Sequence, residues 1–279
     1  MKFSVCIDSV FKGLDQETAL EKVKAAGFSA YEFWGWWDRD IDALAKKADA
    51  LGLNCAAFCT RFIPLTAPGQ RGAYLEGLKE SIKAAGKLGA KVLISQVGSD
   101  TGAVRAFQHK SVVAGIQAAA PLLEGSGVTL AIEPLNGRVD HIGTYLEFSD
   151  EGFEILEEAG ISAGPSGGNS SGIPVEPSGS LTAGIGDSRN GGIKLLFDIY
   201  HQQITEGDII RRFSGHIPQI AHIHSAGTPG RHELDTGELN YREILKALDA
   251  AGYQGYVGLE YFPQGNAEAG LKRMRDYLS

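Results

Sequence analysis

Four side chains that can bind a metal ion or move a proton each follow an apolar, strand-like run of the sequence. They are Glu133 in AIEPLN (131–136), Asp198 in LFDIYHQ (196–202), His224 in IAHIHS (220–225) and Glu260 in GLEY (258–261). Carboxylates gathered in a buried place repel one another unless a cation neutralises them. Three carboxylates and one imidazole suit Mg²⁺ or Mn²⁺, with Zn²⁺ as a further candidate. The pattern therefore predicts one divalent-metal site; separate salt-bridged or hydrogen-bonded residues are the alternative.

The run that contains His224 carries a second histidine, His222. Residues two apart lie on the same face of a strand, so both rings point to the same side of the sheet. His224 lies nearer the carboxyl end of the run and is therefore the ligand candidate. His222 is expected one layer deeper, as a supporting or core residue.

Two further residues, His201 and Arg231, are candidates for binding a substrate. His201 can turn over the end of its strand if the strand stops soon after Asp198. Arg231 lies in a polar loop, and its planar guanidinium can bind a carboxylate through two hydrogen bonds. The alternative for Arg231 is an exposed ion pair with Glu233 or Asp235.

Three tryptophans, Trp34, Trp36 and Trp37, lie together in AYEFWGWW (30–37). Aromatic rings at the end of a strand can form the floor of a sugar-binding pocket, or they can simply pack against the core. The sequence leaves both interpretations open.

Short strand-like runs alternate with longer helical patterns along the whole chain. Strands are predicted at 2–8, 30–37, 53–60, 91–98, 128–136, 193–201, 220–227 and 256–263. Helical patterns with a 3.6-residue apolar period include 16–27, 41–52, 74–89 and 241–252, and each ends at a glycine. This alternation implies a parallel sheet with right-handed crossovers.

Eight strands in one chain favour closure of the sheet into an α/β fold of the (β/α)₈ TIM-barrel type, with residues 1–279 as a single domain. The motif G-x-G-x-x-G does not follow the first strand, which disfavours a dinucleotide-binding fold. In a barrel, reactive groups lie at the carboxyl ends of the strands and in the loops that follow. The candidate site residues all fall at such places.

One interval between strands is much longer than the others, from the fifth strand at 128 to the sixth at 193. Residues 161–192 contain 9 Gly, 7 Ser and 3 Pro. This composition predicts an irregular insertion between the helix after strand five and strand six. Such an insertion lies on the face of the barrel opposite the expected site, and an oligomer contact is the alternative to a tolerated insertion.

Composition disfavours several classes of protein. The chain has 26 Lys and Arg against 34 Asp and Glu, a net charge of −8, which disfavours binding to a nucleic-acid backbone. No run reaches the ~18 apolar residues of a membrane helix, and the N-terminus does not read as a signal peptide. Cys6, Cys55 and Cys59 lie in apolar strand-like runs, which predicts reduced core residues of a cytoplasmic protein.

At the candidate site residues the chain resembles the xylose-isomerase-like TIM barrels, and most closely the hydroxypyruvate isomerase family. The matching stretches are IEPLN (132–136), FDIYHQQ (197–203), PGRHE (229–233), TGELNY (236–241) and GLEY (258–261). Smaller similarities are GFSAYEFW (27–34) and AEAGLKRMRDYL (267–278). The resemblance covers nearly the whole chain apart from 161–192.

The resemblance implies a divalent-metal-dependent isomerase of a small hydroxy-oxo acid, which converts hydroxypyruvate to tartronate semialdehyde by proton transfer through an enediolate. It implies the metal ligands Glu133, Asp198, His224 and Glu260. It further implies Glu133 and Glu260 as the acid and base, and His201 and Arg231 as substrate contacts. A homo-oligomer is plausible by the same resemblance.

The chain departs from the family at His224, where hydroxypyruvate isomerases tend to have Gln, and at Ala226-Gly227, where they tend to have Ala-Asp. A histidine at that place is typical of ketose 3-epimerases. A ketose 3-epimerase or a 2-oxo-tetronate isomerase is therefore the alternative. An apurinic endonuclease would need further histidines from strands two to four, which have none. A non-catalytic barrel is disfavoured by the complete set of four ligands.

Overall fold

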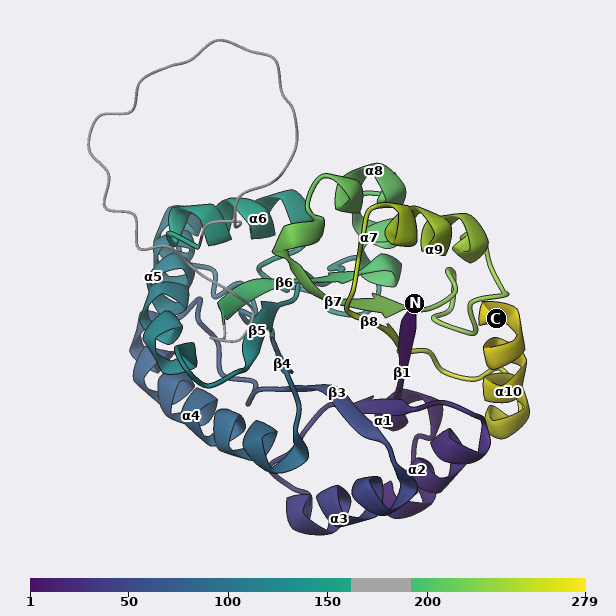
Figure 1. Ribbon diagram of the computed structural model, residues 1–279. Helices are drawn as coiled ribbons and strands as arrows, with labels where there is room; N and C mark the ends of the chain where they lie inside the picture. Colours follow the sequence, from purple (N-terminus) through teal and green to yellow (C-terminus); the bar gives the residue numbers. More distant parts are fainter. Residues whose placement is uncertain (162–191) are drawn as a thin grey trace.

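The protein folds as a closed barrel of eight parallel strands, joined in the order β1 to β8 with β8 paired to β1 (Figure 1). The structure is a computed structural model that describes residues 1–161 and 192–279. The strands are β1 (Lys2–Cys6), β2 (Ala30–Phe33), β3 (Asn54–Cys59), β4 (Val92–Ser95), β5 (Thr129–Ile132), β6 (Gly192–Asp198), β7 (Ile220–Ser225) and β8 (Tyr256–Leu259). The prediction of a single-domain (β/α)₈ barrel is confirmed.

Helices surround the barrel on its outer side (Figure 1). In the described residues they are α1 (Ile7–Val10), α2 (Gln16–Ala25), α3 (Ile41–Leu51), α4 (Arg71–Leu88), α5 (Arg105–Leu123), α6 (Ser149–Glu158), α7 (Ile199–Thr205), α8 (Ile209–Ser214), α9 (Tyr241–Ala250) and α10 (Ala267–Leu278). None of these helices is both long enough and apolar enough to cross a membrane.

Local sequence signals set the ends of several helices. The side chains of Asp15 and Asp40 accept hydrogen bonds from backbone N–H groups in the first turns of α2 and α3. Gly52 and Gly89 end α3 and α4 in the left-handed conformation, which glycine adopts without steric cost. The glycine stops that the sequence predicted are therefore present.

Two apolar clusters make up the core. The larger one fills the space between the barrel and the helices. The smaller one consists of Ala57, Cys59, Ile94, Ala131 and Leu196, which come from four adjacent strands. Because side chains two apart share a strand face, the residues two positions further along β5 and β6 point to the same side as this cluster. Those positions are Glu133 and Asp198, two of the predicted ligands. They therefore lie above a floor of small and aliphatic side chains.

Some predicted boundaries were wrong. The first strand stops at Cys6 and turns at once into α1, so Asp8 is helical. The sixth strand stops at Asp198, whose side chain caps the helix that carries His201. The predicted insertion, 161–192, lies outside the described residues except for its two end positions, Ile161 and Gly192, and stays a prediction.

Packing between the barrel and its helices predicts which substitutions lower the free energy of unfolding most. Phe197 in β6 is fully buried, with its ring 6.1 Å from the ring of Phe213 in α8. We expect Phe197→Ala to lower the free energy of unfolding in urea by about 3–5 kcal/mol, because it leaves a cavity. Phe107→Ala, at a side chain 73% exposed, should change it by less than about 0.5 kcal/mol. Equal effects of the two substitutions would contradict this packing.

Candidate active site

The barrel brings the four predicted ligands together at the carboxyl ends of β5, β6, β7 and β8. Glu133 and Glu260 directly follow β5 and β8, Asp198 ends β6, and His224 pairs with Asp198 in the register of β6 and β7. All four are buried, and one ligand atom from each lies within 4.8 Å of the others. The predicted proximity of the four side chains is therefore present in the structure.

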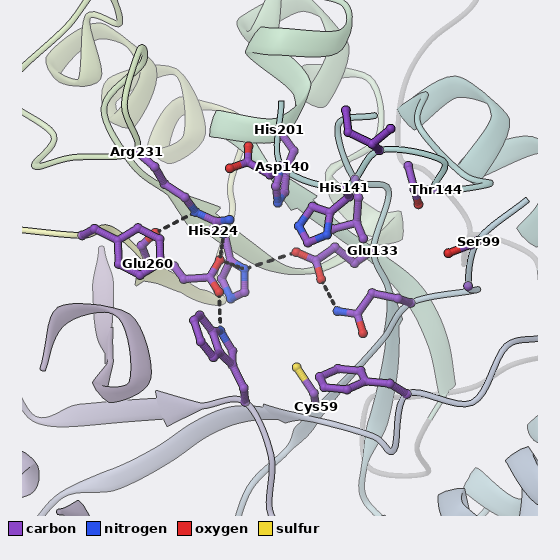
Figure 2. Close-up of a pocket in the computed structure, with 17 residues that line it drawn as sticks. Cys59, Ser99, Glu133, Asp140, His141, Thr144, His201, His224, Arg231 and Glu260 are labelled. Carbon is purple, nitrogen blue, oxygen red and sulfur yellow. Dashed lines mark hydrogen bonds and ion pairs between the residues drawn. The ribbon is translucent and has the colours of Figure 1, made fainter. Parts of the chain in front are cut away.

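His224 lies between Glu133 and Glu260 (Figure 2). Its Nδ1 is 3.1 Å from Oε2 of Glu260 and 3.5 Å from Oε1 of Glu133. Its Nε2 points the other way, 3.0 Å from Oε1 of Glu32. The imidazole therefore joins the mouth of the pocket to a deeper layer of the barrel.

That deeper layer is organised by Glu32 of β2, which the sequence analysis did not identify. Its Oε2 accepts a hydrogen bond from Oγ of Ser4 at 2.6 Å and lies 2.9 Å from Nε2 of His222. Burial opposes the charge on Glu32, but His224 and His222 lower the pKa of its carboxyl to about 2. Burial opposes the charge on His224, but Glu260 and Glu32 raise the pKa of its ring well above the usual value, and its Nδ1 faces the pocket. The supporting position predicted for His222 agrees with this arrangement.

Gly258 makes room for the Glu32 carboxylate. A Cβ atom on Gly258 would lie 2.4 Å from Oε1 and 2.6 Å from Oε2 of Glu32, closer than any non-bonded contact allows. Gly258 also pairs with His224 in the register of β7 and β8. The glycine in GLEY is therefore needed for the contact between Glu32 and His224.

Asp198 has a different task for each carboxylate oxygen. Its Oδ1 accepts hydrogen bonds from the backbone N–H groups of Tyr200 and His201 and so begins α7. Its Oδ2 is 3.4 Å from Nε2 of His201 and 3.7 Å from Nη2 of Arg231. The early end of β6 thus turns His201 over the mouth of the barrel, as predicted for a strand that stops at this point.

Arg231 is buried and contacts the acidic cluster, so the alternative of an exposed ion pair with Glu233 or Asp235 was wrong. Its Nη2 donates to Oε2 of Glu260, and its Nε donates to the Glu260 backbone carbonyl. Its backbone has φ 55°, a left-handed conformation that is uncommon outside glycine. The backbone N–H of Phe262 donates to its carbonyl at 2.7 Å and helps to hold this conformation.

Charges around the pocket shift the ionisation of its members in opposite directions. Burial opposes the charge on Glu260, but Arg231 and His224 outweigh it and hold the pKa of its carboxyl well below the usual value. Burial raises the pKa of Asp198, although Arg231 and His224 oppose this effect. Burial and Arg231 lower the pKa of His201 to about 3, so its ring is neutral. Two neighbouring carboxyls therefore have different affinities for a proton.

Three members of the cluster, Glu133, His224 and Glu260, line a cavity of about 660 Å³ (Figure 2). Trp34 lines this cavity and donates from its indole Nε1 to Oε1 of Glu260 at 2.6 Å. Trp36 instead donates to Ser81, and Trp37 packs edge-on against Phe62. Of the three tryptophans, only Trp34 belongs to the cavity wall.

Gln96, which directly follows β4, is a second residue that the sequence analysis missed. Its Nε2 donates to Oε2 of Glu133 at 2.6 Å, which leaves Oε1 on the side of His224. A signal existed for both missed residues. Glu32 is a lone carboxylate between the apolar residues Tyr31 and Phe33, and Gln96 lies two positions beyond the inward-facing Ile94.

The donor set fits a divalent cation. Three carboxylates and one imidazole nitrogen converge in a buried place, which is costly without an opposing charge. Both ring nitrogens of His224 are buried, and neither makes a hydrogen bond of good geometry within the described part of the chain. Nε2 lies 3.0 Å from Oε1 of Glu32, and a carboxylate beside the second ring nitrogen is a common setting of a metal-binding histidine.

A closed parallel barrel with ionisable residues at the carboxyl ends of its strands defines a (β/α)₈ barrel with an enzyme-like site. Residues 20–163 and 181–278 match the xylose isomerase-like TIM barrel family. The chain belongs to this family, as the sequence motifs predicted.

Two curated relatives match nearly the full chain. A 2-oxo-tetronate isomerase of Cupriavidus necator is 31% identical over 278 residues, which cover 95% of each protein. A hydroxypyruvate isomerase of Escherichia coli is 26% identical over 99% of each protein. Among solved structures, an AP endonuclease of family 2 from Brucella melitensis superposes with a TM-score of 0.84 at 23% identity, over 99% of this chain and 98% of that one. The structural likeness establishes the shared fold.

The contact between Gly258 and Glu32 predicts that two Gly→Ala substitutions change stability in opposite directions. We expect Gly258→Ala to lower the free energy of unfolding by about 1–3 kcal/mol, because the new methyl group must displace a buried carboxylate. Gly86→Ala is the control: it lies in α4 with nothing within 4 Å of its added Cβ and should raise stability by about 0.5–1 kcal/mol. Urea unfolding of both variants measures the difference. Equal stability of Gly258→Ala and the unmodified protein would be evidence against the contact.

Proposed function

We propose that this protein is a divalent-metal-dependent isomerase of a small hydroxy-oxo acid, of the hydroxypyruvate to tartronate semialdehyde type. The observation that carries the proposal is the convergence of Glu133, Asp198, His224 and Glu260 in one buried cluster, beside Arg231 and at the wall of the cavity. The cavity is also large enough for a substrate of several carbon atoms. The reaction moves one proton between neighbouring carbons through an enediolate.

The expectation of an isomerase agrees with the full-length relatives, which are named 2-oxo-tetronate isomerase and hydroxypyruvate isomerase. Both names describe small hydroxy-oxo acids as substrates. Their match over nearly the whole chain includes every strand that contributes to the pocket. The isomerase class is therefore confirmed, and the metal, the substrate and the residue roles are our proposal.

The two glutamates are proposed as the acid and the base. Glu133 and Glu260 approach His224 from β5 and β8, on either side of the pocket (Figure 2). Gln96 donates to one oxygen of Glu133, and Trp34 and Arg231 donate to the two oxygens of Glu260, so both carboxylates are held in place beside the cavity. One glutamate removes the proton next to the carbonyl, and the same or the opposite glutamate returns it at the neighbouring carbon.

Arg231 and His201 are proposed to bind the substrate. Both line the cavity, and both stand beside Asp198 at the mouth of the barrel. Arg231 supplies a positive charge for a substrate carboxylate, while the neutral ring of His201 supplies a hydrogen bond without added charge. Trp34 lines the cavity next to Glu260 and holds one oxygen of its carboxylate.

A divalent ion would be held by Glu133, Asp198, His224 and Glu260. When bound, Mg²⁺ or Mn²⁺ polarises the carbonyl of the substrate and stabilises negative charge on its oxygens. The three carboxylates favour these hard cations, and Zn²⁺ is the other ion that the set can accept. Glu32 contributes by orienting the ring of His224 from behind.

A 2-oxo-tetronate isomerase is the second candidate. The 31% identity to such an enzyme exceeds the 26% identity to the hydroxypyruvate isomerase, and a four-carbon acid also has the carboxylate that Arg231 needs. A ketose 3-epimerase is the third candidate, which rests on the histidine at position 224. A substrate series from three to six carbons, tested with Mg²⁺ and with Mn²⁺, separates the three.

We further propose a cytoplasmic location, since Cys6, Cys55 and Cys59 are all buried and unpaired. The prediction of reduced core cysteines agrees with this arrangement. A homo-oligomer stays a prediction.

Removal of the proposed base should abolish turnover and leave the fold intact. We expect Glu260→Gln to lower kcat for isomerisation of the best substrate by roughly 100- to 10,000-fold, because a neutral amide cannot take a proton. Exchange of substrate hydrogen for deuterium from solvent water measures the same step directly. Glu124→Gln, at an exposed glutamate, is the control and should keep full activity. Near-normal turnover of Glu260→Gln would rule out its assignment.

The role of Glu32 can be measured by metal binding alone. We expect Glu32→Ala to weaken binding of Mn²⁺ by roughly 10- to 100-fold in calorimetry, because His224 loses the group that orients it. Ser4→Ala removes one hydrogen bond to Glu32 but keeps its charge, so it should have a much smaller effect. Unchanged affinity in Glu32→Ala would separate Glu32 from the metal site.

A further inference from the structure

Asn136 follows β5 in the motif IEPLN, is fully buried, and holds one end of the pocket in place. Its side-chain Oδ1 accepts hydrogen bonds from the backbone N–H groups of Val139 and Asp140, each at 3.0 Å. Its Nδ2 donates to Oδ2 of Asp140 at 2.7 Å and also contacts Nδ1 of His201. The amide therefore touches a loop on one side and a substrate-binding candidate on the other.

The two backbone donors determine which way the amide of Asn136 is turned. Only the oxygen of an amide can accept from N–H groups, so the nitrogen must face His201 and Asp140. An amide nitrogen has two protons and no acceptor capacity. Its two protons match its two acceptors, the carboxylate of Asp140 and Nδ1 of His201. Nδ1 of His201 is consequently an acceptor and carries no proton.

The other nitrogen of His201 must then carry the proton of the ring. Nε2 is buried and makes no hydrogen bond of good geometry with any described residue, although Oδ2 of Asp198 is 3.4 Å away. A distance of 3.4 Å is long for an N–H···O bond. His201 lines the cavity, and its ring stacks edge-on with His141 at 5.1 Å between centroids. The Nε2–H group is thus a buried donor at the cavity wall without a strong partner.

We infer that Asn136 is a positioning residue that fixes His201 as a neutral Nε2–H donor, and that this donor binds an acceptor oxygen of the substrate. The second half of the inference rests on the proposed function; the first half does not. The partner of Nε2–H is then a carbonyl or carboxylate oxygen of the hydroxy-oxo acid. His201 neither supplies a positive charge nor removes the proton, which leaves those tasks to Arg231 and the glutamates.

The proton on His201 can be observed by long-range ¹H–¹⁵N correlation of the histidine rings at pH 7. The metal-free, substrate-free protein suffices, and the signals of His201 are assigned by their loss in His201→Gln. We expect an unprotonated Nδ1 and a protonated Nε2. A proton on Nδ1 in the unmodified protein would overturn the inference, whatever the outcome of the substrate series.

Two variants test whether Asn136 determines this state. Asp140→Asn keeps an oxygen to accept from Asn136 and from Oη of Tyr200, so the ring of His201 should be unchanged. In the exchanged pair Asn136→Asp with Asp140→Asn, the new carboxylate still accepts from the backbone N–H groups of the loop. It can only accept from His201, so Nδ1 should gain a proton. An unprotonated Nδ1 in the exchanged pair would show that Asn136 is not the determinant.

The substrate half of the inference has its own test in the steady-state kinetics of two His201 variants. His201→Gln places an amide N–H near the position of Nε2, whereas His201→Asn places one near Nδ1 only. We expect His201→Asn to raise KM by roughly tenfold, about the value of one neutral hydrogen bond, and His201→Gln to raise it by much less. Equal losses in both variants would refute a donor role at Nε2.

Discussion

The structure depends on one electrostatic constraint, the burial of four carboxylates, Glu32, Glu133, Asp198 and Glu260, inside the mouth of a single barrel. Their mutual repulsion in a place shielded from water has to be opposed by positive charge and by hydrogen-bond donors. Arg231 supplies charge from the loop after β7, and His224 stands between the carboxylates with one nitrogen toward each layer. Donors come from Ser4 in β1 and from Trp34 and Gln96, which directly follow β2 and β4. Nearly the whole circumference of the barrel therefore takes part in stabilising the pocket, and a bound cation would complete the same balance.

Much of this could be predicted from the sequence, because the periodic parts of the chain carry strong signals. Apolar runs, helical spacing and glycine stops indicated eight strands in alternation with helices, and eight strands indicated a barrel. In a barrel of parallel strands, residues at the carboxyl ends of the strands lie at one rim. Glu133, Asp198, His224 and Glu260 do so. The family resemblance added the isomerase class, which the full-length relatives confirm.

The remaining features depend on distances across the barrel, which spacing along one strand does not encode. Glu32 reaches His224 because Gly258, on a third strand, lacks a side chain. The sequence alone does not reveal that these three positions meet. The end of the sixth strand was also uncertain. Asp198 stops β6 by capping the next helix, but Ile199 and Tyr200 after it are as apolar as the residues before it. The pairing of Arg231 with Glu260 likewise requires the loop geometry, including the left-handed backbone at Arg231.

The position of Trp34 gives the molecule an optical property of its own. Its indole N–H donates to Oε1 of Glu260, and its backbone N–H donates to Oδ2 of Asp8. Hydrogen bonds therefore hold both its ring and its backbone. Indole emission responds to nearby charge, and here the nearest charge belongs to a group at the centre of the pocket. Trp36 and Trp37 lie outside the cavity wall, next to the guanidinium of Arg61. The indole of Trp34 is therefore an intrinsic fluorophore in direct contact with the ionic cluster of the pocket.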